Sequence, residues 1–478
     1  MWRLLKLECL KLFKDVRLYC GAILLLLLLC YGFEVRQAAI LKNISAMDTS
    51  RAHQQRQCEK YLSLLDSVSN YGKLVDDYAD DPRNPVYYSQ QSPQFAHIPL
   101  KPLGILAHGQ SDLYNEEILL SARFRDPRQQ KQDMLNPSLL KFGPFDAATV
   151  LVLLFPLFII TLSFNFLSAE KENGSLRLIA VQAGNIRKWI WAKTVLYGLV
   201  SFLLTFLVCL ALMVVYKTGI RNNYASLIIF GVLLLGYSFF WQLLAVLINA
   251  WGKSSAFNAL MLVGCWVIFA FVLPALSNLT ANELYKVPSR VSFINTVRLA
   301  NVEAEKLDSS QLANQYFFDH PELAEKKDTT GKSRFSANDF WKEIVISQEL
   351  INKKADPIYD AYSQKVKSSN RFAGYMSWVS PASAFNKGLL QLAGTSSGDY
   401  FRFSDSAMQY RSSFLAGIRD QILLNKEITY KEVIQRTPFR YEPIGDYRVL
   451  WIILAFFIYT SICFIGIQKN ITNQHLAE

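Results

Sequence analysis

Long apolar runs alternate with charged segments along this chain of 478 residues. Six runs are long enough to cross a membrane, because about 20 helical residues span roughly 30 Å of hydrocarbon. They are residues 18–33, 145–167, 189–216, 224–250, 256–276 and 447–467. The pattern predicts an all-α integral membrane protein with six transmembrane helices.

Two long connectors separate these runs, over residues 34–144 and 277–446. Apolar residues recur at helical spacing over residues 51–78 of the first connector, and the proline-rich segment 82–102 is expected to be irregular. The second connector predicts helices over residues 282–307, 337–366 and 404–425. Together the connectors predict a largely helical extracytoplasmic domain built from two long loops.

Lysine and arginine residues indicate on which side of the membrane each segment lies. They gather before the first span, in residues 1–17, and between the second and third spans, in residues 168–188. Short loops rich in Lys and Arg stay in the cytosol. We therefore expect both termini, including the tail 468–478, in the cytosol and the two long connectors outside. The formal charge of +11 reports this topology, and no basic patch with interleaved aromatics predicts nucleic-acid binding.

The N-terminal segment has an amphipathic pattern over residues 2–17. Arg3, Lys6, Lys11, Lys14 and Arg17 fall on one arc of a helical wheel, with Leu5, Cys9, Leu12, Phe13 and Val16 largely opposite. Such a helix is expected to lie along the inner membrane surface; the alternative is a basic flank that only sets topology. The first span is expected to stay as an anchor, because Leu28 and Leu29 precede Cys30 where a lipoprotein signal has small residues.

Composition and motifs exclude several classes of protein. Hydrophobic residues make up 51% of the chain, too many for an ordinary soluble protein. The span interiors hold no ionisable residue, which argues against a proton- or sodium-coupled transporter. No G-x-x-x-x-G-K-[ST] motif supplies an ATPase site, so the energy for any work comes from another chain.

Ser380 and His320 lack a G-x-S-x-G context, and Cys58 is the only external cysteine. Neither an enzyme, a metal site nor a disulfide framework is predicted.

The connector 168–188 carries the sharpest local pattern. It reads Glu170-Lys171-Glu172-Asn173-Gly174-Ser175-Leu176-Arg177 between two apolar spans. Gly174 permits a turn, the apolar side chains of Leu176, Leu178 and Ile179 form a short face, and Arg187 and Lys193 mark the start of the third span. These features predict a short helix at the membrane surface that another protein can grip; the alternative is a solvated positive-inside loop.

This connector resembles the E-x-E-x-G-[ST]-L…R…K signature of ABC-2 type permeases, the membrane subunits of one class of ATP-binding-cassette exporter. The usual proline before the arginine is replaced by Ala183-Gly184-Asn185. The resemblance implies that the connector couples the chain to a separate ATPase subunit, through Glu170, Glu172, Gly174, Ser175, Leu176, Arg177, Arg187 and Lys193. It also implies that ATP and Mg²⁺ bind that ATPase, that this chain holds no cofactor, and that a second permease completes a homodimer or heterodimer. The implied location is a bacterial inner (cytoplasmic) membrane.

The first external loop, together with Ser380-Pro381-Ala382 and Leu392-Ala393-Gly394-Thr395, resembles a subgroup of these permeases with a DUF3526-type external region. The resemblance implies an exporter whose external domain gates the exit or hands cargo to an outer or periplasmic partner. Two alternatives stay open: an ABC-driven mechanotransducing or assembly complex that transports nothing, and a non-transporting membrane scaffold.

Pro156 and Pro274 are expected to kink their spans, either as hinges or to shape the packing.

Overall fold

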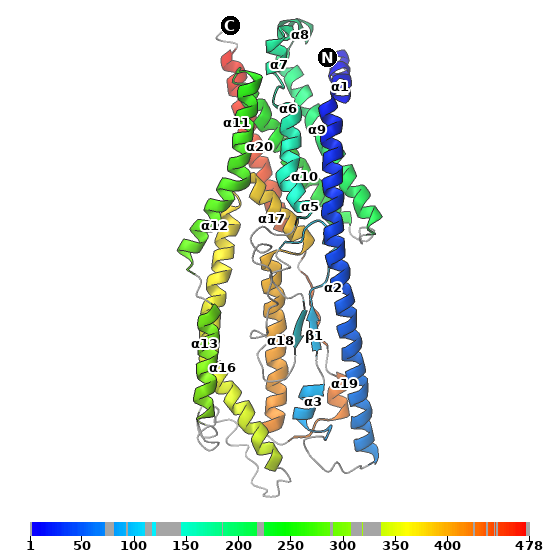
Figure 1. The fold of residues 1–478 in the computed structure, drawn as a ribbon, viewed down its shortest axis with the longest axis vertical. Helices are drawn as coiled ribbons and strands as arrows, with labels where there is room; N and C mark the ends of the chain where they lie inside the picture. Colours follow the sequence, from blue (N-terminus) through cyan, green and yellow to red (C-terminus); the bar gives the residue numbers. More distant parts are fainter. Residues whose placement is uncertain are drawn as a thin grey trace.

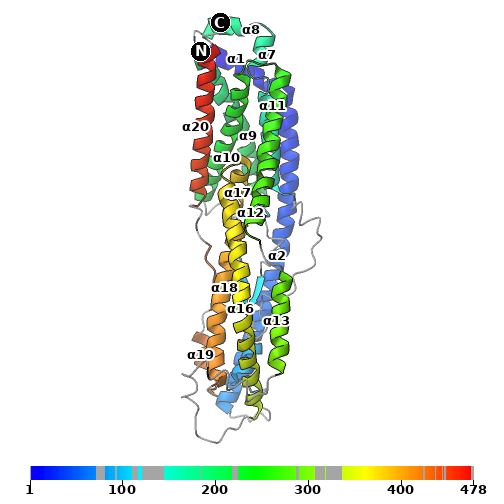
Figure 2. The same ribbon diagram turned by 90° about the vertical axis from the view of Figure 1, so that its left-hand side faces the viewer.

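The computed structural model describes residues 2–71, 81–91, 94–109, 117–120, 145–183, 185–217, 224–286, 290–306, 318, 336–423, 426–435, 438–443, 445 and 448–474. The molecule is elongated, with a bundle of apolar helices at one end and a looser group of helices at the other (Figure 1). Both chain termini lie at the bundle end (Figures 1 and 2). An even number of spans requires this arrangement.

The bundle end is built from α1 (Trp2–Phe13), the first part of α2 (Val16–Tyr71), α5 (Ala147–Thr149), α6 (Phe155–Ser163), α7 (Ser168–Glu172), α8 (Ser175–Ala183), α9 (Ile186–Val215), α10 (Tyr224–Asn249), α11 (Ser255–Val267) and α20 (Val449–Gln474). The other end holds the remainder of α2, α3 (Pro85–Gln91), β1 (Gln94–His97), β2 (Glu117–Leu120), α13 (Arg290–Glu305), α16 (Ser336–Met376), α18 (Ser397–Leu423) and α19 (Tyr430–Gln435). Two elements, α12 (Leu273–Leu284) and α17 (Pro381–Ala393), lie where the two groups meet (Figure 1).

Six helical stretches of the described chain are long and apolar enough to cross a membrane. They are Val16–Val68, Ala147–Glu172, Ile186–Val215, Tyr224–Asn249, Ser255–Leu284 and Val449–Asn470. Each overlaps one of the six predicted runs, so the prediction of six apolar helices of spanning length is confirmed. The central helix of the bundle is α10, which contacts α6, α9, α11, α17 and α20 and buries Leu233, Tyr237 and Trp241.

The helix that contains the first apolar run does not end where that run ends. α2 continues as one helix of 56 residues from the bundle to the far end of the molecule (Figure 1). The sequence predicted two separate helices here, over residues 18–33 and 51–78. The reason for the difference is that no proline or glycine interrupts the chain between Gly32 and Tyr71, so nothing breaks the helix where it turns polar.

Two regions of the two long connectors differ from the sequence-based expectation. The segment 82–102, expected to be irregular, contains α3 and β1, and β1 pairs antiparallel with β2 in the register Gln94 with Leu120. This two-stranded sheet is a small exception to the all-α prediction. The helices α13, α16 and α18 of the second connector lie close to their predicted positions, with α16 and α18 longer than expected.

α17 is an unpredicted helix at the junction between the bundle and the looser group of helices (Figure 1). Ser380 caps its start by accepting a hydrogen bond from the Ser383 N–H at 3.2 Å, Pro381 occupies the first turn, and Gly394 ends it with a left-handed φ of +73°. The residues Ser380-Pro381-Ala382 and Leu392-Ala393-Gly394 are therefore the two ends of this helix. Its apolar face packs on α10 and α20, and the Phe385 ring stacks on Tyr237 at 4.1 Å between centroids.

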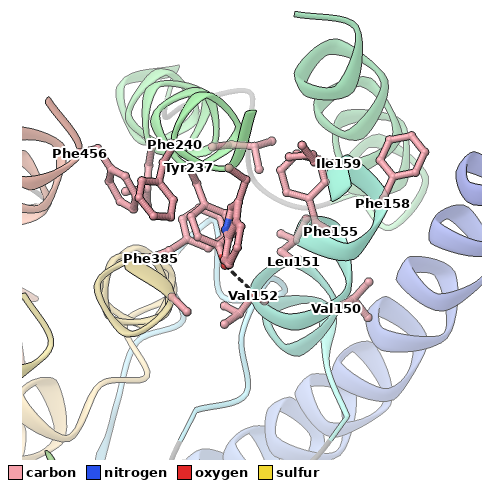
Figure 3. Close-up of a cluster of buried hydrophobic side chains, with 14 of the residues drawn as sticks. Val150, Leu151, Val152, Phe155, Phe158, Ile159, Tyr237, Phe240, Phe385 and Phe456 are labelled. Carbon is pink, nitrogen blue, oxygen red and sulfur yellow. Dashed lines mark hydrogen bonds between the residues drawn. The ribbon is translucent and has the colours of Figure 1, made fainter. Parts of the chain in front are cut away.

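Two π-helical turns precede the intramembrane prolines, η3 (Val150–Leu154) before Pro156 and η5 (Ile268–Val272) before Pro274. Proline lacks an N–H, so it leaves a carbonyl of the preceding turn without its helical donor. Tyr237 donates its hydroxyl hydrogen bond to the Val152 carbonyl at 2.7 Å (Figure 3), and Ser380 donates to the Phe269 carbonyl at 2.5 Å. Side chains of α10 and of the α17 cap thus stabilise both π-helical turns.

Candidate docking site at the bundle end

The connector 168–188 folds into the two short helices α7 and α8 at the end of the bundle that carries both termini (Figures 1 and 2). Gly174 joins them with a left-handed φ of +69°. No heavy atom lies within 4 Å of the position that a Cβ on Gly174 would occupy. The glycine is therefore required by its backbone conformation and not by crowding.

Glu170 points into the protein. It is 5% exposed, accepts a hydrogen bond from the Lys11 ammonium at 2.5 Å, and accepts another from the Ser175 hydroxyl. Lys193 lies 3.9 Å from the same carboxylate. This single carboxylate joins α1, α8 and α9 to α7, and its side chain is not part of the exposed surface.

Lys193 is buried beside Glu170, with 3% of the residue exposed. Its ammonium donates to the Phe166 carbonyl at 3.0 Å, pairs with Glu8 of α1 at 3.4 Å, and lies 4.9 Å from the centres of the Phe166 and Trp189 rings. Buried charges persist in proteins when they are paired and hydrogen-bonded. Lys193 therefore fixes the start of α9 against α1 and the end of the second span.

Glu172 caps a different helix. Its carboxylate accepts hydrogen bonds from the Ser255 N–H at 2.7 Å and the Ser255 hydroxyl at 2.8 Å, at the first residue of α11. Lys171 donates to the Gly252 carbonyl in the turn before α11 at 3.2 Å. A carboxylate at a helix N-terminus is stabilised by the free N–H groups and the helix dipole. α7 is thus attached to the turn between α10 and α11.

α8 divides its side chains between the bundle and the solvent. Leu176 and Ile179 pack against the bundle core, whereas Leu178 is 61% exposed and Val181 is 82% exposed. Arg177 is also exposed. The short apolar face predicted from Leu176, Leu178 and Ile179 is therefore two faces, one that anchors α8 and one that is open to a partner.

The start of α9 replaces the missing proline of the motif with a capping asparagine. Asn185 accepts a hydrogen bond from the Lys188 N–H at 3.2 Å. Arg187 is exposed in the first turn of the helix. The turn into the third span is thus defined without proline.

Sequence reasoning missed the α1 partners of this site. The structure ends α1 at Phe13 instead of continuing to residue 17, and its buried face holds Glu8 and Leu12. Lys11, expected on the polar arc of an interfacial helix, reaches Glu170. The available signal was Glu8, an acidic residue three positions before Lys11 in an otherwise basic helix.

No group of three or more His, Cys, Asp or Glu residues within the described chain is arranged to hold a metal ion. A family model described as a domain of unknown function (DUF3526) matches residues 290–444, which span α13 to α19. The predicted DUF3526-type region is thereby confirmed for this part of the second long connector. Comparisons with curated proteins and with solved structures give no match.

Proposed function

We propose that this chain is the membrane-spanning permease subunit of an ABC-2 type exporter, driven by a separate ATPase subunit. One observation carries the proposal: α8 exposes Leu178 and Val181 at the bundle end, while the α7 carboxylates next to it are bonded to three other helices. The match to DUF3526, a family typical of ABC-2 permeases, supports the same assignment.

The bonds around α7 give a route for force. A partner that pushes on α8 moves α7, because only the Gly174 turn separates the two helices. Glu170 then carries the displacement to α1 and α9, and Glu172 carries it to α11. We infer that the glutamates transmit the motion and that the exposed α8 face, with Arg177, makes the contact.

The remaining parts of the complex follow from this role. ATP and Mg²⁺ bind on the ATPase subunits, and a second permease, identical or related, completes the pair of membrane halves. We place the chain in a bacterial inner membrane with both termini and α8 in the cytosol, because the basic segments 1–17 and 168–188 lie at that end. The external part gates the exit or hands cargo to an outer partner.

A mechanotransducing complex is the second candidate, and the continuity of α2 favours it. The same helix crosses the bundle and reaches the far end of the external part, so bundle motion can act there without transport. ATPase activity that no cargo stimulates would distinguish this role from export.

The first experiment is purification of the chain from its native membrane in mild detergent, followed by mass spectrometry of the bound proteins. A stoichiometric ABC ATPase is expected. The double variant Leu178→Glu/Val181→Glu should lose that ATPase, whereas Ile434→Glu in α19, 57% exposed at the other end, should retain it. A chain that emerges alone, or with non-ATPase proteins only, would favour the scaffold instead.

Gly174→Pro tests the coupling step separately. Proline cannot adopt a φ of +69°, so the α7–α8 turn must change. The variant is expected to insert normally but to hydrolyse ATP without export. Unchanged export would argue against transmission through this turn.

A further inference from the structure

A cavity of about 940 Å³ lies at the opposite end of the bundle from α8. The ends of two spanning segments form one wall, through Pro274 and Ser277 of α12 and Trp451 of α20, and the external helices α16, α17 and α18 form the others. Figure 2 shows these external helices meeting the bundle at this level. Its size is in the range of small-molecule sites.

The lining of this cavity is strongly basic. It contains the cationic side chains of Lys101, Lys367, Arg371, Lys387, Arg402 and Arg448, and the acidic side chains of Asp399 and Asp405. Both acids are already engaged: Asp405 accepts from Lys367 at 2.7 and 2.9 Å, and Asp399 accepts from Arg402. The other cations therefore leave the cavity with an excess of positive charge.

Lys387 is the cation held most firmly in the wall. It lies on α17, a helix fixed by its apolar contacts with the bundle, and donates to the Gly374 carbonyl at 2.7 Å. Within the described residues it forms no ion pair, and burial lowers the pKa of its ammonium. An anion beside it would offset that desolvation and stabilise the charged form. Arg371, on α16, likewise forms no ion pair with a described residue.

Aromatic side chains stand beside the basic groups. Trp378, Tyr375 and Trp451 line the cavity, and the last two are 65% and 62% exposed. Tryptophan and tyrosine collect where a membrane meets water, because one part of the ring system is apolar and the other polar. The cavity thus has both cationic and aromatic side chains in its lining, beside the ends of spanning helices.

We propose that this cavity binds an anionic amphiphile, with a phosphate or carboxylate head beside Lys387 and Arg371 and an apolar tail along the bundle near Trp451. The head group accepts charge-assisted hydrogen bonds from Lys387 and Arg371, two of the cations that Asp399 and Asp405 do not engage. The tail stays in hydrocarbon, so the ligand enters from the membrane. This site does not depend on the ATPase-coupling role of α8.

The test is equilibrium binding of fluorescent phosphatidylglycerol and phosphatidylcholine to the purified full chain in detergent. Phosphatidylglycerol is expected to bind at least about tenfold more tightly, since hydrogen bonds to charged groups are individually worth that factor or more. Lys387→Gln/Arg371→Gln should remove this preference. Lys365→Gln, an exposed lysine on α16 outside the cavity, should leave it unchanged.

Several results would overturn the proposal. They are equal affinity for the two lipids, an unchanged preference in the double variant, and competition by inorganic phosphate as effective as that by phosphatidylglycerol. If the double variant elutes as an aggregate, Arg371→Gln alone provides the test, because Arg371 is exposed. Mass spectrometry of the retained amphiphile then identifies its source. An ordinary anionic phospholipid indicates a resident lipid, another acidic amphiphile indicates cargo, and neutral lipid alone contradicts the site.

Discussion

Replacement of Lys193 by methionine is the sharpest test of the buried charges that hold α1, α7 and α9 together. Methionine keeps much of the side-chain length but removes the ammonium. The Phe166 carbonyl loses a donor at 3.0 Å and Glu8 loses its ion pair at 3.4 Å. Glu170 keeps Lys11 and Ser175, so Glu8 is the group left without compensation.

The magnitude follows from burial. Glu8 is 7% exposed and Lys193 is 3% exposed. Removing one partner of a buried ion pair costs about 3–5 kcal/mol, because the other charge stays in a poorly solvated position. Lys193→Met/Glu8→Gln removes both charges. Its loss of unfolding free energy should therefore be smaller, by about 1–3 kcal/mol, than the sum of the losses in the two single variants.

Equilibrium unfolding of the purified chain in increasing dodecyl sulfate measures these free energies. Lys188→Met is the matched control, because Lys188 is exposed one turn earlier on the same helix and should change stability by less than about 0.5 kcal/mol. If Lys193→Met unfolds like the control, the buried charges do not hold these helices together and the proposed force route through Glu170 loses its basis.

Three further changes are expected to have measurable effects on unfolding. Tyr237→Phe leaves a buried carbonyl of η3 without its donor and should cost about 1–3 kcal/mol by the same unfolding assay. Gly388→Val places a Cβ 2.6 Å from the fully buried Leu233, so it should destabilise by about 1–3 kcal/mol; if Leu233→Ala does not restore stability, the clash is not the cause. Burial lowers the pKa of His97 from its usual 6.5, outweighing Glu117 at 3.6 Å, so the folded state favours neutral imidazole. Stability should therefore fall as the pH drops below about 6.5, and an unchanged slope in His97→Gln would contradict this cause.

The spans were predictable because hydrocarbon thickness imposes a length on each apolar run. The continuity of α2 was not, since its apolar signal stops near Glu34 while its backbone has no reason to break. α17 carried recognisable caps in Ser380 and Gly394. Its position inside a connector nevertheless concealed that it packs on spanning helices.

The sequence predicted the local shape of the connector but not which side chains it brings together. The glycine turn and the short helix follow from neighbouring residues. The inward direction of Glu170 does not, because its partner Lys11 is 159 positions away and reaches it only through the packing of α1. Charge pairs between helices far apart in the sequence have no period that would reveal them.

The length of α2 makes it a lever. At 1.5 Å per residue its 56 residues extend about 84 Å, so a tilt of about 5° at the bundle swings the distal end by about 7 Å. A displacement of that size exceeds the rise of one helical turn, about 5.4 Å. Near that end of α2, Tyr61 and Leu65 are packed against buried residues of other elements. A shift of about 2 Å where Phe33 leaves the bundle can thus become a rearrangement at the far end of the molecule.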